Sequence, residues 1–150
     1  MRLSGHIVTP LGPVSVTEEA GQITALDWRL EEREASPLVT EALAQLAAYF
    51  DGRVKQFDLP LAYGTGIHDK VRRAMMAIPF GETLTYGDIA GMVDAPAQAV
   101  GQACGANPIP IIVLCHRVLG AKTLGGFSAK GGVETKVWLL RHEGAAGLLI

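Results

Sequence analysis

The sequence predicts a mixed α/β protein of the α+β type, with a β-sheet and one helix in its first part and mostly helices in its second. Before residue 36, glycine and proline at 12–13 and 20–21 separate short, strand-like segments. From residue 67 onward, apolar residues recur at helical spacing. Pro, Gly and polar residues collect without periodicity at 60–66, which predicts two domains, 1–62 and 63–150.

The first domain is expected to be a β-meander followed by one helix. Ser36 suits the N-cap of this helix, Pro37 its first position, and Gly52 its C-terminal end. Residues 54–59 are expected to add a short strand. The apolar stripe of the helix is predicted at Val39, Leu43, Leu46 and Phe50. Period-two alternation predicts a half-buried strand with one face made of Thr24, Leu26, Trp28 and Leu30.

The second domain is expected to begin with an amphipathic helix from Ile67 that ends before Pro79, because a proline ring disfavours continuation of a helix. Thr85 can cap the next helix, with Asp88 answering three residues later as in a capping box. A turn at 94–96 leads to a second short helix at 97–105, so the pair has the outline of a helix-turn-helix. A final helix is predicted over 133–142.

The helix at 97–105 has an unusual surface, because most of its side chains are very small. Its long polar groups are Gln98 and Gln102. Small residues permit close approach of the helix to another surface, and the groove of a DNA duplex and a neighbouring helix fit this composition equally well. Side chains that read base edges are nearly absent, so a DNA-binding helix of this kind should read little sequence.

The stretch 107–118 is interpreted as the centre of the molecule. Its apolar, β-branched run at 109–114 predicts a buried extended segment, which ends abruptly at Cys115, His116 and Arg117. An imidazole and a guanidinium beside a cysteine lower the thiol pKa and favour a nucleophile. A buried structural cysteine is the alternative, and the three residues alone do not decide between the two. Cys104 is expected to be a reduced core residue.

Composition and charge restrict the class of protein. With 150 residues, 49% of them hydrophobic, the chain can bury a core, and no run is long enough to span a bilayer. Nothing at the N-terminus resembles a signal peptide, and two cysteines fit a reducing compartment, so a cytoplasmic protein is expected. Neither CxxC nor HExxH spacing occurs, so no metal is expected.

Positive charge is concentrated in the second half of the chain. Residues 1–62 hold five Lys/Arg against nine Asp/Glu, a net of −4, and residues 63–150 hold eight against six, a net of +2. Any anion-binding surface is therefore expected in the second half. The glycine-rich loop at 125–132 matches no phosphate-binding fingerprint, and it suits either a loop that wraps a flat ligand or a plain connector.

Several short motifs of the second half, taken together, resemble the O6-alkylguanine-DNA alkyltransferases, also called methylated-DNA-protein-cysteine methyltransferases. They occur in the order and spacing of that family between residues 67 and 144. The resemblance implies a ribonuclease-H-like sheet and helix as an N-terminal scaffold and a C-terminal domain for DNA binding and alkyl transfer. The motifs are 78–81, 85–90, 99–101, 107–108, 115–118, 126–128 and 136–144.

The resemblance also implies an irreversible, single-turnover reaction in DNA repair. An O6-alkylated guanine is flipped out of double-stranded DNA, and its alkyl group is transferred to Cys115. His116 would draw off the thiol proton through a bound water, with Glu143 fixing the imidazole tautomer. Tyr86 would donate a proton or hydrogen bond to the departing base, and Asn107 would brace the turn. No cofactor, membrane or obligate protein partner is implied, and a monomer is expected.

The residues expected to contact the DNA or the flipped base include two departures from the family pattern. Gln98 stands where the family usually has an arginine that fills the space left by the base, and Phe127 replaces a tyrosine. A third departure is Leu114, which stands where a proline usually precedes the nucleophile. The expected contact residues are Thr85, Ala97, Gln98, Ala99, Gly101, Arg117, Phe127 and Ser128.

Other function classes fit the sequence less well. A sensor that binds alkylated DNA without repairing it would lack the nucleophile, whereas Cys115 is present. A helix-turn-helix regulator would need side chains that read bases. A cysteine hydrolase would need turnover and an oxyanion hole, which the sequence does not identify.

Overall fold

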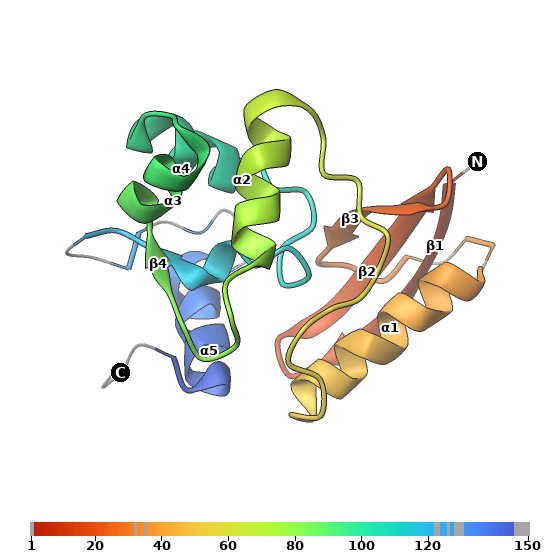
Figure 1. Cartoon of the computed structure of the whole chain (residues 1–150). Coiled ribbons are helices and arrows are strands. Elements are labelled where there is room, and N and C mark those ends of the chain that lie inside the picture. Colours follow the sequence, from red (N-terminus) through yellow and green to blue (C-terminus); the bar gives the residue numbers. More distant parts are fainter. Residues whose placement is uncertain are drawn as a thin grey trace. The chain divides into compact units, whose positions relative to one another are not determined.

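The computed structural model describes residues 2–31, 33–34, 36–121, 124–125, 127 and 131–145 (Figure 1). The chain divides into two compact units, Met1–Ala62 and Tyr63–Ile150. No helix within the described ranges is long and apolar enough to cross a membrane.

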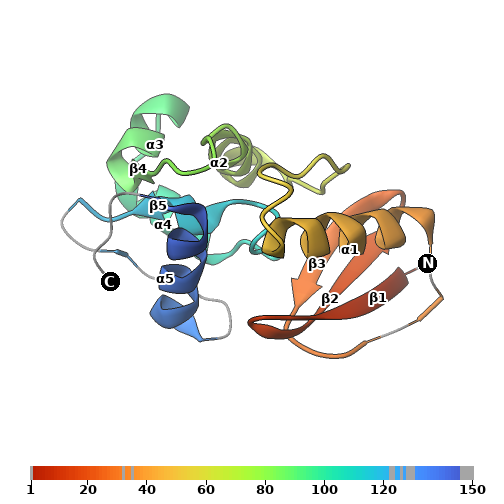
Figure 2. The ribbon, with the colours of Figure 1, turned by 90° about the horizontal axis from the view of Figure 1, so that it is seen from below.

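The first unit contains an antiparallel sheet of three strands in the order β1-β2-β3, so the predicted β-meander is confirmed. The strands are β1 (Arg2–Thr9), β2 (Gly12–Glu19) and β3 (Gln22–Asp27). The helix α1 (Pro37–Phe50) lies along the sheet (Figure 2). A Cβ on Gly5 of β1 would lie 3.1 Å from both Leu43 and Val39, so the missing side chain allows close approach of helix and strand.

The predicted signals at both ends of α1 are confirmed. The Ser36 hydroxyl accepts a hydrogen bond from the Val39 N–H at 3.0 Å, and Pro37 opens the helix. Gly52 follows the helix with a φ of +78°, a conformation that glycine adopts without strain. The buried face is centred on Val39, Ala42, Leu46 and Tyr49, and the predicted Leu43 and Phe50 are half-buried at its sides.

Two predictions about strands in the first unit are wrong. The strand β3 ends at Asp27, and Leu30 beyond its end is 60% exposed. Its buried residues are Ile23 and Leu26, because a register shift opposite Thr17 and Glu18 breaks the alternation of the two faces.

Residues 54–59 form no strand either. The Gln45 side chain of α1 binds both backbone polar groups of Asp58, accepting from its N–H at 2.9 Å and donating to its C=O at 3.0 Å. An isolated parallel bridge, between Ile23 of β3 and Leu61, lies just after these residues.

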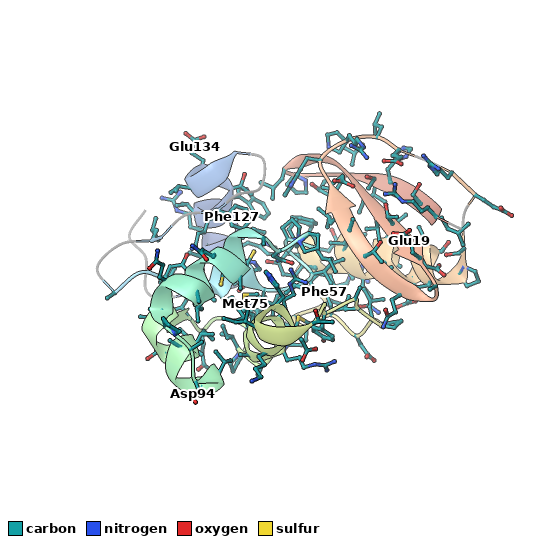
Figure 3. The ribbon with its side chains drawn as sticks, turned by 90° about the horizontal axis from the view of Figure 1, so that it is seen from above. Glu19, Phe57, Met75, Asp94, Phe127 and Glu134 are labelled. Atoms are coloured by element: carbon teal, nitrogen blue, oxygen red, sulfur yellow. The ribbon has the colours of Figure 1, made fainter. Side chains whose placement is uncertain are left out.

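The second unit is mostly helical, and its predicted pair of short helices is confirmed. In chain order it contains α2 (Gly66–Met76), β4 (Leu84–Thr85), α3 (Tyr86–Val93), α4 (Ala97–Gly105), a 3-10 helix (Cys115–Arg117), β5 (Val118–Leu119) and α5 (Gly132–Glu143). Thr85 and Asp88 form the predicted capping box at the start of α3. Asp94, labelled in Figure 3, ends α3 in the left-handed conformation, with a φ of +56°.

The segment at 109–114 is fully buried, but the prediction that it is extended is wrong. The Val113 N–H donates to the Ile109 carbonyl at 2.9 Å, and Ile111 has a φ of +72°. Such a φ is rare for a β-branched residue and stores backbone strain. The chain therefore turns inside the core, and Cys115 follows directly after this buried turn.

Leu114 completes a tight turn just before the thiol. Its φ of −82° and ψ of 48° are close to those of an inverse γ-turn. The Cys115 N–H donates to the Val113 carbonyl at 2.8 Å across this turn. A proline fixes φ near −65°, so Leu114 already has nearly the backbone conformation that the family's usual proline would impose.

We expect Leu114→Pro to leave the free energy of unfolding within about 1 kcal/mol of the parent protein. The gain from a stiffer unfolded chain opposes the loss of a buried leucine side chain. Denaturant unfolding measures this change, and Leu114→Gly, which loosens the turn and leaves a cavity, is the matched control. A Leu114→Pro variant as unstable as the glycine variant would show that the turn cannot accommodate proline.

Candidate alkyl-transfer site

Cys115 occupies the first position of the 3-10 helix and is 8% exposed. Its pKa differs in direction from the sequence prediction, which attributed a lowered value to His116 and Arg117. Burial raises the pKa of the Cys115 thiol, and the groups that lower it are the Asn107 side chain, through a hydrogen bond, and the Lys136 ammonium. The thiolate is therefore supported by residues other than those adjacent to it in the sequence.

Asn107 organises the loop that carries the thiol. Its amide nitrogen donates to the Val113 carbonyl at 3.1 Å, and its amide oxygen accepts from the Ile109 N–H at 3.0 Å. These two bonds close the buried turn and satisfy backbone groups that water cannot reach. One side chain thus holds the loop and lowers the pKa of the thiol that the loop carries.

His116 and Glu143 form a buried pair, with the imidazole Nε2 and a carboxylate oxygen 2.7 Å apart. Burial lowers the pKa of His116, with Glu143 acting in the opposite direction, so the imidazole is neutral near pH 7. A carboxylate only accepts hydrogen bonds, so Nε2 carries the proton and Nδ1 is the basic atom. Nδ1 makes no hydrogen bond to the part of the chain that the structure describes.

Arg117 is the residue whose predicted contact with DNA is wrong. Its side chain is fully buried, and its Nε donates to Glu143 at 2.7 Å. A second bond from Nη2 to the same carboxylate spans 3.2 Å, and Nη1 donates to the Ile78 carbonyl at 2.6 Å. Its position next to the nucleophile suggested a contact with DNA, but the guanidinium instead pairs with the buried Glu143 carboxylate through charge-assisted hydrogen bonds.

Lys136 is a site residue that sequence reasoning missed. It lies on α5 with 0% exposure, its Nζ donates to the Val118 carbonyl at 2.6 Å, and it lies 5.9 Å from the centre of the Tyr86 ring. Burial lowers its pKa to about 8, and the Cys115 and Cys104 thiols act in the opposite direction. It opens the motif at 136–144, but sequence reasoning assigned it no role, because its hydrogen-bond acceptor is a backbone carbonyl.

Tyr86 opens α3 and packs against the backbone of Gly125. A Cβ on Gly125 would lie 2.7 Å from the Tyr86 hydroxyl oxygen, so only glycine leaves room for the phenol there. Phe127 is half-buried and follows in the same loop (Figure 3). Ser128, predicted to contact the flipped base, lies outside the described residues.

Cys104 lies buried on α4, and burial raises its pKa to about 12, so it is a poor nucleophile. Its thiol contacts the sulfur of Met75 at 3.7 Å. No group of three or more His, Cys, Asp or Glu that could hold a metal ion occurs among the described residues.

Comparison with known proteins identifies the family. The family model described as the DNA binding domain of 6-O-methylguanine DNA methyltransferase matches residues 66–145. The model described as the ribonuclease-like domain of the same enzyme matches residues 4–63. The chain belongs to the 6-O-methylguanine DNA methyltransferase family.

Curated relatives support this membership over nearly the whole chain. The constitutive methylated-DNA–protein-cysteine methyltransferase of Bacillus subtilis is 40% identical, covering 90% of this chain and 91% of that protein. The corresponding methyltransferase of Mycobacterium tuberculosis is 40% identical, covering 91% of this chain and 89% of that protein.

Solved structures show that the fold is the methyltransferase fold, as predicted. A crystal structure of Mycobacterium tuberculosis O6-methylguanine methyltransferase superposes with a TM-score of 0.82 at 38% identity, covering 96% of this chain and 93% of that one. The same organism's protein in complex with DNA gives a TM-score of 0.81 at 39% identity, covering 94% and 92%.

Four of the residues predicted to contact DNA lie on α4. Ala97 and Gln98 are exposed on its first turn, whereas Ala99 and Gly101 are half-buried. Val100, Ala103 and Cys104 make up its buried face. Thr85 is half-buried and uses its hydroxyl to cap α3.

The surroundings of the glycines of α4 bear on whether its small residues serve packing against a neighbouring helix or docking on a DNA groove. A Cβ on Gly101 or Gly105 would meet no atom of the described chain within 4 Å. Tight packing against a neighbouring helix therefore does not require glycine at these two positions, which leave open space beside α4.

We expect Lys136→Met to slow alkylation of Cys115 by iodoacetamide at pH 7 by about tenfold, because the buried cation that lowers the thiol pKa is gone. Methionine keeps the buried volume without the charge. The effect should diminish as the pH rises above about 8, where Lys136 itself loses its proton. Mass spectrometry of Cys115 over a pH series measures the rate.

Lys70→Met, which removes an exposed lysine of α2, is the control and should not change this rate. Equal pH profiles for Lys136→Met and the parent protein would show that the ammonium does not support the thiolate.

Proposed function

We propose that this protein repairs double-stranded DNA by transferring an alkyl group from O6-alkylguanine to Cys115 in one irreversible turnover. The observation that carries the proposal is the buried Cys115–His116–Glu143 arrangement, in which the only basic nitrogen of the imidazole has no partner in the described chain. Unit 2 supplies all the groups involved, so we infer that a monomer suffices and that unit 1 serves as scaffold.

The thiol must lose its proton for the reaction to begin. His116 Nδ1 accepts this proton, relayed by a bound water as the family resemblance implies, while Glu143 stabilises the imidazolium that forms. The Lys136 ammonium and the Asn107 amide stabilise the thiolate. The thiolate sulfur then attacks the alkyl carbon in line with the bond to O6.

The transfer step is a displacement at the alkyl carbon. A sulfur–carbon bond forms, the carbon–O6 bond breaks, and the bonding electrons remain on the guanine. Tyr86 donates a proton or hydrogen bond to the departing base. The products are guanine in DNA and an S-alkylcysteine, whose carbon–sulfur bond makes the transfer irreversible.

The surface of α4 supports docking on a DNA groove. Apart from Gln98 and Gln102, its exposed residues are alanine and glycine, so the helix backbone can approach a duplex closely, and flipping then delivers the base to the thiol. Neither α3 nor α4 contains a lysine or arginine. These two helices therefore offer close contact and helix-terminal dipoles to the duplex rather than ion pairs with phosphates.

Incubation with a duplex oligonucleotide that carries O6-methylguanine tests the function. We expect the intact protein to gain the mass of one methyl group on Cys115, with stoichiometric loss of the lesion. The Cys115→Ser variant should bind the same duplex and gain no mass. Unmodified parent protein that still shifts the lesion duplex would instead indicate a sensor of alkylated DNA.

We expect Gln98→Arg to tighten binding to the lesion duplex or speed transfer by about tenfold, the value of ~1.4 kcal/mol from one charge-assisted hydrogen bond. An arginine adds both reach and charge at the space left by the flipped base. Gln102→Arg, which adds the same charge to an exposed position one turn later, is the matched control. Titration and single-turnover kinetics at fixed salt measure both quantities.

An equal gain in Gln102→Arg would show a general electrostatic effect. No change in Gln98→Arg would show that residue 98 does not occupy the space left by the base.

A further inference from the structure

Arg72 is a buried cation that the transfer chemistry does not use. It lies on α2, is 7% exposed, and hydrogen-bonds two backbone carbonyls from different segments. Its Nη1 donates to the Tyr63 carbonyl at 2.9 Å and its Nη2 to the Ala106 carbonyl at 3.4 Å. Nε has no partner in the described chain, and burial lowers the pKa of the group.

The Ala106 carbonyl that Arg72 binds lies between α4 and the loop that carries the nucleophile. Ala106 is the C-cap of α4, where the helix dipole is negative and a cation is stabilising. The next residue is Asn107, whose side chain closes the buried turn before Cys115 and lowers the pKa of its thiol. Arg72 thus holds the one peptide that joins α4 to the loop of the nucleophile.

The chain leaves room for this guanidinium. Gly64 has a φ of +83°, and a Cβ there would lie 2.8 Å from Nη1 of Arg72. A side chain at residue 64 would push the guanidinium away from the Tyr63 carbonyl. The neighbouring Arg73 has a different environment, because it is exposed, pairs with Asp69 at 2.8 Å and stacks over the Tyr63 ring at 4.2 Å.

We propose that Arg72 is a positioning residue that acts through Asn107, by fixing the α4 C-terminus so that the Asn107 amide keeps the two hydrogen bonds that close the buried turn in front of Cys115. This inference rests on the proposed alkyl transfer for its kinetic readout. Its geometric part concerns the reactivity of the free thiol and is tested without DNA.

Two readouts are measured on Arg72→Met, Asn107→Ala and the double variant. The first is the pH profile of Cys115 alkylation by iodoacetamide without DNA, and the second is single-turnover methyl transfer from an O6-methylguanine duplex. We expect Arg72→Met to shift the alkylation profile to higher pH, in the direction of Asn107→Ala, and to slow transfer by about tenfold. The double variant should be no slower than Asn107→Ala alone, because the two residues act in series.

Arg73→Met is the matched control, and its alkylation profile should equal that of the parent protein. Arg72→Lys retains the buried charge but reaches one carbonyl, so its profile and rate should fall between those of the parent protein and Arg72→Met. If the methionine variant does not fold, the lysine variant carries the same test.

Independent, multiplying effects in the double variant would overturn the inference, as would an unchanged alkylation profile in Arg72→Met or Arg72→Lys. A parent protein that transfers no methyl group refutes the proposed function alone, because the DNA-free profiles still decide the role of Arg72.

Discussion

The carboxylate of Glu143 is the group on which the site around Cys115 depends. A buried charge without partners is too costly to keep, and here both oxygens are hydrogen-bonded, one to Arg117 and the other to Arg117 and His116. Without Glu143, Arg117 would be an uncompensated buried cation and the imidazole would lose its fixed tautomer. Because Glu143 is the last residue of α5, the same bonds hold that helix against the loop of the nucleophile. The hydrogen bonds of Glu143 therefore both stabilise the fold and orient the imidazole of His116.

Local signals in the sequence predicted most of the fold. Ser36 caps α1, and Thr85 with Asp88 caps α3, because such hydrogen bonds involve residues a few positions apart. The buried loop could not be predicted in this way. Its β-branched residues fit a strand, and its turn depends on the Asn107 side chain together with a left-handed φ at Ile111.

Burial of charged residues was the other limit of sequence reasoning. Arg117 pairs with a residue 26 positions away, and Lys136 binds a backbone carbonyl, which has no signature in a sequence. The net charge of +2 in the second half consequently does not describe its surface, because three of its eight cations, Arg72, Arg117 and Lys136, are buried. The prediction that any anion-binding surface lies in the second half therefore needs support beyond the net charge.

Docking helices without cations have a consequence for how such a protein would search DNA. Contacts that release few counterions give weak affinity for undamaged duplex, since non-specific binding comes mainly from neutralised phosphates. Each visit to an intact site would then be short, and the molecule would sample distant stretches by dissociating and rebinding rather than by prolonged sliding. Residence would lengthen only where a base enters the pocket, so the lesion itself, more than the surrounding helix, would determine where the single available turnover is used.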